Sequence, residues 1–318
     1  MARLPRPRAG VRSLAALIAL LLATPLVAED ESFDPPPRRS LDETCLLISE
    51  RLASVRLPDC RDGGLRYSGA WSNLGTPILY KEYPPLPGRE PQGRVLLFGG
   101  IHGDEYSSIS IVFHWMRILN EHHSGRFHWL VVPLLNPDGL LRSRPTRTNE
   151  RGIDLNRNFP SAQWREEGYR RWVERTGKRP RYFPGHEPLS EPETRWLTAI
   201  IRGFQPDAII SVHAPLGLVD YDGPGEPPAS LGSLRLRRLG NFPGTLGHFA
   251  GVDYGIPVVT IELESAGRMP APGEVTAIWT DMVRWLGTSV PFERSEERMT
   301  DMAGDGISDP ATPRDPRR

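Results

Sequence analysis

The chain has 318 residues, of which 38% are hydrophobic and 25% are charged, so it can build a sizeable core and has the composition of a soluble enzyme. That composition excludes a disordered chain, a collagen and a protein with several membrane spans. The 39 Lys and Arg residues balance the 39 Asp and Glu residues, so no net positive field attracts nucleic acid or anionic lipid. We therefore expect no nucleic-acid partner.

The N-terminus has the pattern of a signal peptide. Arginines from Arg3 to Arg12 precede an uncharged apolar run from Ser13 to Ala28. That run is shorter than the roughly 20 residues that span a bilayer, so it favours a signal peptide at residues 1–28 over a retained membrane anchor. We expect a periplasmic or secreted protein with no stable membrane insertion after the signal is removed.

Composition divides the rest of the chain into three parts. Residues 29–39 are acidic and then proline-rich, have no hydrophobic period, and are typical of a linker. Residues 40–287 carry the hydrophobic patterns and form the expected catalytic domain. Residues 288–318 are polar and rich in proline, so we expect a disordered tail.

The domain is expected to begin with an amphipathic helix closed by a disulfide. Ser40 and Glu43 form a capping box, and apolar residues recur at helical spacing as far as Val55. Cys45 and Cys60 are the two cysteines of the chain, and an exported protein favours a disulfide between them. Such a link would stabilise the fold by roughly 3 kcal/mol. Two free buried thiols are the alternative.

Strands alternate with helices through the rest of the domain. Short apolar runs predict strands at residues 78–83, 95–98, 129–135, 208–212 and 258–261. Helical spacing predicts helices at 105–120, after a capping box at Ser190 and Glu193, and from Val275 through Trp285, ending before Gly287. This alternation predicts an α/β fold.

Two histidines and two carboxylates follow predicted strands. His102 and Glu105 are three residues apart at the start of a helix and so share one face, and His213 ends another strand. Ligands gather at the carboxyl edge of α/β sheets, so these three side chains are expected to bind Zn²⁺ and leave a position open for water. Glu262 ends a further strand and is the candidate general base. Glu264 is its rival, because strand phase puts both on one face.

A polar loop between these strands holds the remaining candidates. Arg147 is expected to face a developing oxyanion, and Asn156 and Arg157 to bind a substrate carboxylate, for which a guanidinium fork is suited. Asp154 could orient a ligand histidine.

In this order the motifs resemble the zinc carboxypeptidases of the M14 type over roughly residues 94–287. The resemblance rests on HGDE, NPDG, RTN, GIDLNRNFP, SVH and TIELESAG. It implies a mixed, largely parallel sheet flanked by helices, and the zinc-binding, oxyanion-binding and carboxylate-binding roles given above. It also selects Glu262 over Glu264 as the base.

Within that family the chain is similar to the bacterial murein peptide amidases, through FGGIHGDEYSS, SVHAPLGLVDYDGP and NFPGTLGHFAG. That resemblance implies a murein peptide substrate, cleaved between γ-D-glutamate and diaminopimelate. The sequence departs from digestive carboxypeptidases in lacking a tyrosine ahead of Gly244, for which Tyr221 and Tyr254 are the two replacements considered. It departs from the amidases in its signal peptide.

Other functions share parts of this pattern. A zinc carboxypeptidase of different peptide specificity would keep every motif. Aspartoacylase-like and succinylglutamate-desuccinylase-like deacylases also resemble an HGxE start and a DLNR segment, but NPDG and TIELE favour a peptidase. An inactive peptide-binding module would keep the carboxylate clamp, and the intact ligands and base disfavour it.

Overall fold

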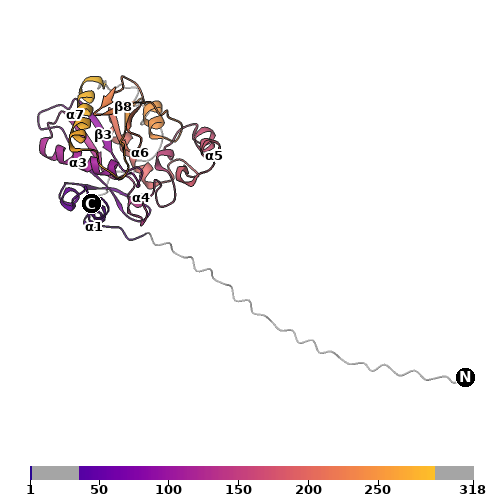
Figure 1. Cartoon of the computed structure of the whole chain (residues 1–318). Coiled ribbons are helices and arrows are strands. Elements are labelled where there is room, and N and C mark those ends of the chain that lie inside the picture. The colour runs from indigo at the N-terminus through magenta and orange to yellow at the C-terminus, as the bar shows by residue number, and fades with distance from the viewer. Residues whose placement is uncertain (2–35, 291–318) are drawn as a thin grey trace, which may run out of the picture. The chain divides into compact units, whose positions relative to one another are not determined.

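A nine-stranded sheet with helices on both faces forms the core of residues 36–290, which with Met1 are the residues that the computed structural model describes (Figure 1). The strands are β1 (Arg66–Trp71), β2 (Pro77–Tyr83), β3 (Gly93–Phe98), β4 (Phe127–Val132), β5 (Ala208–His213), β6 (Leu218–Asp222), β7 (Ser230–Leu231), β8 (Leu234–Leu236) and β9 (Val258–Glu262). The helices are α1 (Leu41–Arg51), α2 (Leu57–Arg61), α3 (Tyr106–His122), α4 (Pro137–Leu141), α5 (Arg170–Thr176), α6 (Pro192–Phe204) and α7 (Pro272–Ser289). Four short helices are η1 (Leu155–Arg157), η2 (Trp164–Tyr169), η3 (Pro180–Tyr182) and η4 (Gly247–Asp253).

The sheet is mixed, with a parallel centre. Its strand order is β1-β2-β4-β3-β5-β9-β6-β8-β7. Strands β4, β3, β5 and β9 run parallel, whereas β2 pairs antiparallel with β4, and β6 pairs antiparallel with β9. The predicted mixed, largely parallel sheet flanked by helices is therefore confirmed. Four further strands, β1, β6, β7 and β8, lie outside the parallel centre and were not predicted from the sequence.

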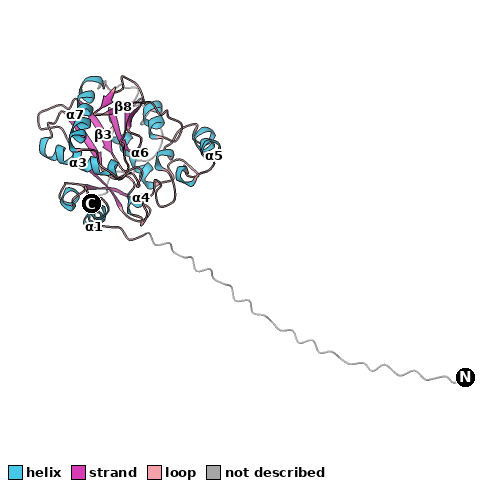
Figure 2. Ribbon diagram, viewed as in Figure 1, coloured by secondary structure: helices cyan, strands magenta, loops and turns pink. Residues whose placement is uncertain are grey.

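Helices lie on both faces of the sheet (Figure 2), and alternate residues of the central strands belong to the two different cores between sheet and helices. Val95 and Leu97 of β3 belong to a core with buried residues of α3 and α7, whereas Leu96 and Phe98 belong to a core with α6 and η4. Successive residues of a strand point to opposite faces, so one layer of helices covers each face. Burying each such side chain contributes about 1.5–3 kcal/mol relative to leaving it exposed.

Helix α1 begins at the predicted capping box. The Ser40 hydroxyl accepts the Glu43 N–H, and the Glu43 carboxylate accepts the Ser40 N–H at 2.7 Å. The helix ends at Arg51, before the predicted limit at Val55, which is nevertheless buried. The structure joins Cys45 and Cys60 in a disulfide, with their Cα atoms 5.4 Å apart, and so links α1 to α2.

The borders of the domain differ in detail from the predicted ones. The described end of the predicted linker packs on the domain, since Arg39 N–H donates to the Gly75 carbonyl at 2.8 Å and the Arg38 guanidinium lies 3.8 Å from the Trp71 ring centroid. Helix α7 continues to Ser289. Gly287 does not stop this helix; its lack of a side chain leaves room for the Arg126 guanidinium. The predicted signal peptide and most of the predicted tail lie outside the described residues.

The predicted capping box of α6 is wrong. The N-cap is Glu191, and no side chain caps the helix. Pro192 occupies the first helical position, where a missing N–H is tolerated, and this sets the start one residue later than predicted. The Ser190 hydroxyl instead donates to the Glu191 carboxylate and accepts from the Asn158 amide.

Candidate active site

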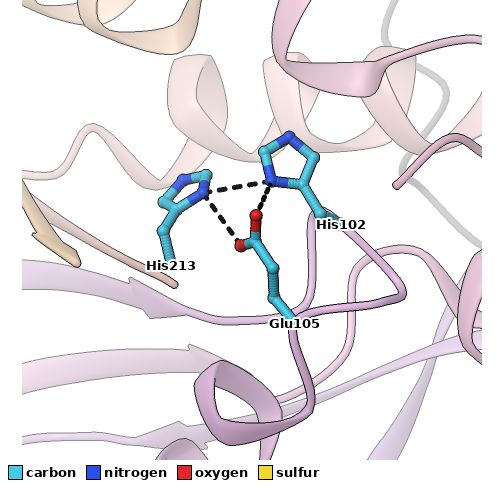
Figure 3. Close-up of side chains that lie close together, drawn as sticks. All are labelled: His102, Glu105 and His213. Atoms are coloured by element: carbon cyan, nitrogen blue, oxygen red, sulfur yellow. Dashed lines mark hydrogen bonds and ion pairs between the residues drawn. The ribbon is translucent and has the colours of Figure 1, made fainter. Parts of the chain in front are cut away.

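Three side chains converge where β3 and β5 end (Figure 3). His102 Nδ1 lies 2.7 Å from Glu105 Oε1 and 3.2 Å from His213 Nδ1, and His213 Nδ1 lies 3.3 Å from Glu105 Oε2. All three side chains are buried, and their potential ligand atoms lie within 4.8 Å of one another. We call these residues the ligand cluster. Two imidazoles and one carboxylate are a donor set typical of a catalytic zinc site, so the residues present fit this metal.

The loop that carries His102 is held by close backbone packing. A Cβ atom at Gly103 would lie 2.1 Å from the carbonyl carbon of Gly139, so only glycine lets this loop approach α4. Asn136, the N-cap of α4, donates to the Ile101 carbonyl at 3.2 Å and accepts the Gly139 N–H at 2.9 Å. The HGDE and NPDG motifs therefore pack directly against each other, although they lie in separate parts of the sequence.

The second nitrogen of each histidine has its own polar partner. His102 Nε2 lies 3.3 Å from Asp154 Oδ1, and His213 Nε2 lies 2.9 Å from the Ser211 hydroxyl. Partners of this kind fix the ring orientation of metal-binding histidines. Burial disfavours the charged form of Asp154, but the nearby guanidinium of Arg147, at 2.7 Å, and that of Arg157 hold its pKa well below the ordinary value. The predicted position of Asp154 beside a ligand histidine is thus what the structure has.

Glu262 lies beside the ligand cluster because of the strand register. In the parallel pair β5–β9, His213 is the partner of Glu262, so their side chains point to the same face. Glu262 is 8% exposed, and its Oε2 accepts the Leu216 N–H at 3.4 Å. Burial, together with the Glu105 carboxylate, raises the pKa of Glu262. A carboxylate with a raised pKa in a cavity is a candidate for proton transfer.

The rival carboxylate, Glu264, lies elsewhere. Strand β9 ends at Glu262, so the alternation that would have kept the two residues on one face does not continue. Glu264 is exposed and lines a different cavity, together with Arg268 and Met269. Glu262 and Glu264 therefore do not share a face, because the strand ends at Glu262, and the sequence does not reveal where that end lies.

The other predicted residues line the same cavity as the ligand cluster. It has a volume of about 390 Å³. Arg147 Nη1 lies 3.1 Å from His102 Nδ1, and Asn156 Oδ1 accepts the Leu246 N–H at 2.9 Å. Arg157 donates to the Asn156 carbonyl and forms no ion pair with a described residue. Burial, with the neighbouring Arg147 charge, lowers the pKa of Arg157 to about 10, so it stays charged at neutral pH.

Five lining residues with a charged group or a phenol were not predicted from the sequence. They are Arg171, Arg181, Tyr182, Asp220 and Asp222. Asp220 is the register partner of Thr260 in β9, so both aspartates of β6 share the face of Glu262. The alternation of acids in LVDYD was a signal for the aspartates. Nothing in the sequence indicated the other three, which come from the segment 164–182.

Neither tyrosine considered as a replacement lies in the cavity. The Tyr221 hydroxyl donates to the Pro224 carbonyl on the opposite face of β6, and the Tyr254 hydroxyl accepts from Arg202 at 3.0 Å. Tyr182 is the tyrosine that lines the cavity, together with Phe242.

The fold and this site together define a hydrolase of the zinc carboxypeptidase class. The model of the peptidase M14 family, described as zinc carboxypeptidase, matches residues 80–222. Murein peptide amidase A of Escherichia coli (strain K12) is 32% identical over 221 residues, which cover 67% of this chain and 87% of that protein. The chain therefore belongs to the M14 family and is a hydrolytic enzyme of the carboxypeptidase or amidase type.

Other relatives agree with this assignment. Murein peptide amidase A of Vibrio campbellii is 34% identical over 151 residues, which cover 47% of this chain and 57% of that protein. The crystal structure of murein-tripeptide amidase MpaA from Escherichia coli O157 is similar with a TM-score of 0.52 and 28% identity, covering 70% of this chain and 92% of that one. A bovine thrombin-activatable fibrinolysis inhibitor structure, at 16% identity and a TM-score of 0.52, covering 84% of this chain and 97% of that one, shows the same fold.

Proposed function

We propose that this enzyme is a zinc-dependent amidase that hydrolyses the bond between γ-D-glutamate and meso-diaminopimelate in murein peptides. The observation that carries the chemistry is the ligand cluster with Glu262 beside it in one cavity. Similarity to proteins named murein peptide amidase A supports the substrate. Zinc bound by the cluster supplies polarisation of the scissile carbonyl and activation of the attacking water.

Glu262 is the proposed general base. Its Oε1 has no hydrogen-bond partner among the described residues, and its raised pKa suits a group that takes a proton from water and returns it to the leaving amine. Arg147 is the proposed oxyanion donor, because its Nη1 lies beside His102 and Glu105 while its Nε is held by Asp154. Losing such a donor lowers turnover about 100-fold to 1,000-fold in other hydrolases.

Asn156 and Arg157 are the proposed binding groups for the carboxylate beside the scissile amide. Arg157 is charged, and its guanidinium forms no ion pair at contact distance with a described residue, since Asp154 acts on it only from farther away. The Asn156 side-chain oxygen is occupied by Leu246 N–H, which leaves its NH₂ group available as a donor. Two adjacent donor groups, one of them charged, suit a carboxylate.

The two aspartates of β6 support a substrate that also carries an ammonium group. Asp222 accepts from the Asn241 amide through Oδ1, and no Lys, Arg or His of the described residues pairs with it at ion-pair distance. Burial raises the pKa of Asp222, as expected for a carboxyl group without a paired cation. The side chain of diaminopimelate carries such an ammonium group. A C-terminal lysine carries one as well, so a carboxypeptidase for basic residues is the second candidate.

We also propose export, on the basis of the N-terminal sequence pattern. Among the described residues, no helix has the length and apolar character needed to cross a membrane. Fractionation of cells that express the full chain tests export: the processed protein is expected outside the cytoplasm, and unprocessed protein in the cytoplasm would contradict it.

The substrate is tested with purified, zinc-loaded protein and four compounds. L-Ala-γ-D-Glu-meso-diaminopimelate is compared with its α-linked L-Glu isomer, a hippuryl dipeptide and an N-acyl amino acid, with products identified by mass. We expect release of diaminopimelate from the first compound at the highest kcat/KM, and release by Glu262→Gln that is slower by about 100-fold or more. Faster cleavage of the α-linked peptide or the hippuryl dipeptide would leave a zinc carboxypeptidase of other specificity, and faster cleavage of the acyl amino acid would indicate a deacylase.

A further inference from the structure

A second cavity, of about 240 Å³, borders the candidate active site. We call the cavity that the ligand cluster and Glu262 line the catalytic cavity. The second cavity shares four lining residues with it: Arg157, Arg171, Tyr182 and Phe242. The remaining wall comes largely from the segment between Gly168 and Pro184, which includes α5. We call it the outer cavity. Because the two cavities share residues, a ligand in one lies next to a ligand in the other.

The outer cavity is strongly cationic. Four arginines line it, Arg157, Arg171, Arg175 and Arg179, and no Asp or Glu is among its lining residues in the described part of the chain. None of the four forms an ion pair with another described residue. Arg179 donates to the Thr176 carbonyl, which is uncharged. Like charges gathered in one place repel each other, and an anion relieves that repulsion.

Aromatic rings hold three of these four guanidinium groups without neutralising them. Phe242 has the Arg157 guanidinium 4.7 Å from its centroid and that of Arg171 at 4.1 Å. Tyr182 has Arg179 at 5.3 Å and Arg147, from the catalytic cavity, at 5.5 Å. Phe242 thus contacts Arg157, which is expected to bind the substrate carboxylate, and Arg171. Tyr182 contacts Arg147, which is expected to act in catalysis, and Arg179. Stacking positions the cations but leaves their N–H donors free for a ligand.

We propose that the outer cavity binds a second carboxylate of the substrate, apart from the carboxylate beside the scissile amide. This inference rests on the proposed function. In the murein tripeptide two groups have this chemistry: the α-carboxylate of γ-D-glutamate and the side-chain carboxylate of diaminopimelate. The shared wall of Arg157 and Phe242 links this subsite to the proposed site of the first carboxylate.

The test compares three peptides and three variants. One peptide has D-isoglutamine in place of D-glutamate, and another has lysine in place of diaminopimelate, so each lacks one of the two carboxylates. Arg175→Gln changes the outer cavity alone, Arg171→Gln changes the shared wall, and Arg170→Gln is the matched control, since Arg170 is exposed on the same helix and lines neither cavity.

We expect wild-type enzyme to favour the full tripeptide over one of the two analogues by about tenfold or more, mainly through KM. The analogue that is cleaved about tenfold less efficiently than the tripeptide lacks the carboxylate that the outer cavity binds. Arg175→Gln and Arg171→Gln should reduce the ratio of kcat/KM for the tripeptide to kcat/KM for that analogue several-fold. Arg170→Gln should leave this ratio unchanged. If Arg170→Gln and Arg175→Gln changed this ratio equally, the effect would be long-range electrostatics and the proposed subsite would be wrong. Unchanged ratios in both Arg171→Gln and Arg175→Gln would also contradict the subsite.

Binding separates failure of the subsite from failure of the proposed function. Titration calorimetry with the three peptides is done on Glu262→Gln, alone and combined with each arginine change. Weaker tripeptide binding in the Arg175→Gln combination, without turnover of any peptide by wild type, would keep the anion subsite and reject the amidase. Turnover with unaltered binding would keep the amidase and reject the subsite.

Discussion

A comparison of two clusters of buried charged side chains in this domain shows that burial alone does not decide what such a cluster does. In the ligand cluster three potential ligand atoms lie within 4.8 Å of one another. The Nε2 atoms of its two histidines form hydrogen bonds with Asp154 and Ser211. The acid cluster, formed by Asp138, Glu191 and Glu193, is equally buried. Within the described residues, however, its oxygens do not converge as a group that could hold a metal ion.

The oxygens of the acid cluster are directed mostly at loops. Asp138 accepts from the Ser72 hydroxyl and the Leu74 N–H, which secures the turn between β1 and β2. Glu191 accepts from the amides of Asn73 and Asn149 at 3.1 and 2.7 Å. Burial of charge alone therefore does not make a metal site. The direction of the ligand atoms, and access to a cavity, make the difference.

The largest effect should come from removing a member of the ligand cluster. His213→Ala should lose stoichiometric zinc on dialysis and all measurable turnover, because a three-ligand site loses chelation with one ligand. Elemental analysis and the tripeptide assay measure the two effects. Glu193→Gln, from the acid cluster, is the control and should keep one zinc per chain. Full zinc in His213→Ala would mean that the third ligand is another residue.

Removing the proposed base should have the next largest effect. Glu262→Gln should keep zinc and the fold but lower kcat about 100-fold to 10,000-fold, because an amide does not accept the proton of water. Glu264→Gln is the matched control and should retain nearly full kcat, since Glu264 lines another cavity. If the two variants exchanged their phenotypes, the base would be Glu264.

The acid cluster should show its effect in stability rather than in activity. Glu193 Oε1 has no hydrogen-bond partner among the described residues, and burial with the nearby Asp138 and Glu191 carboxylates raises the pKa of Glu193 to about 8. Between the ordinary glutamate pKa and pH 8, the native state keeps a proton that the unfolded state has lost. The free energy of unfolding should therefore fall as pH rises, by up to about 1.4 kcal/mol per pH unit.

Glu193→Gln removes this titration. Compared with wild type, the variant should gain stability at pH 8 and gain much less at pH 5, as measured by urea unfolding at both values. Glu187→Gln, at an exposed position nearby in the chain, is the control and should not change the pH slope. Parallel pH profiles for wild type and Glu193→Gln would contradict the assignment.

The smallest predicted effect concerns the partner behind His102. Asp154→Asn keeps the shape of the side chain but removes the charge that faces His102 and Arg147. Partners of this kind typically change metal affinity 10-fold to 100-fold, so zinc should bind measurably but more weakly. Competition with a chelator measures the change. Wild-type affinity in Asp154→Asn would show that the ring is held by other contacts.

The parallel centre of the fold was predictable, and so was the ligand cluster. Strands β3, β5 and β9 consist of apolar runs that are easy to recognise, and His102, His213 and Glu262 stand directly at or after their ends. Strand β6 was missed because its alternating aspartates make it polar on the face that lines the cavity. The start of α6 was misplaced because Pro192 overrides the capping pattern.

The sequence by itself determined the local relations: the capping box of α1 and the alternation that buries the central strands on both faces. These depend on residues a few positions apart, for which backbone geometry gives fixed distances. The shared helical face predicted for His102 and Glu105 is not formed, because α3 begins only at Tyr106 and both residues lie in the loop before it. Only the tertiary structure gave the physical reason why Glu262 rather than Glu264 lines the cavity, and only it showed that Tyr182 joins this cavity and that an arginine-lined outer cavity borders it. Those walls come from segments far apart in the chain, and their separation is set by packing, which no local spacing encodes.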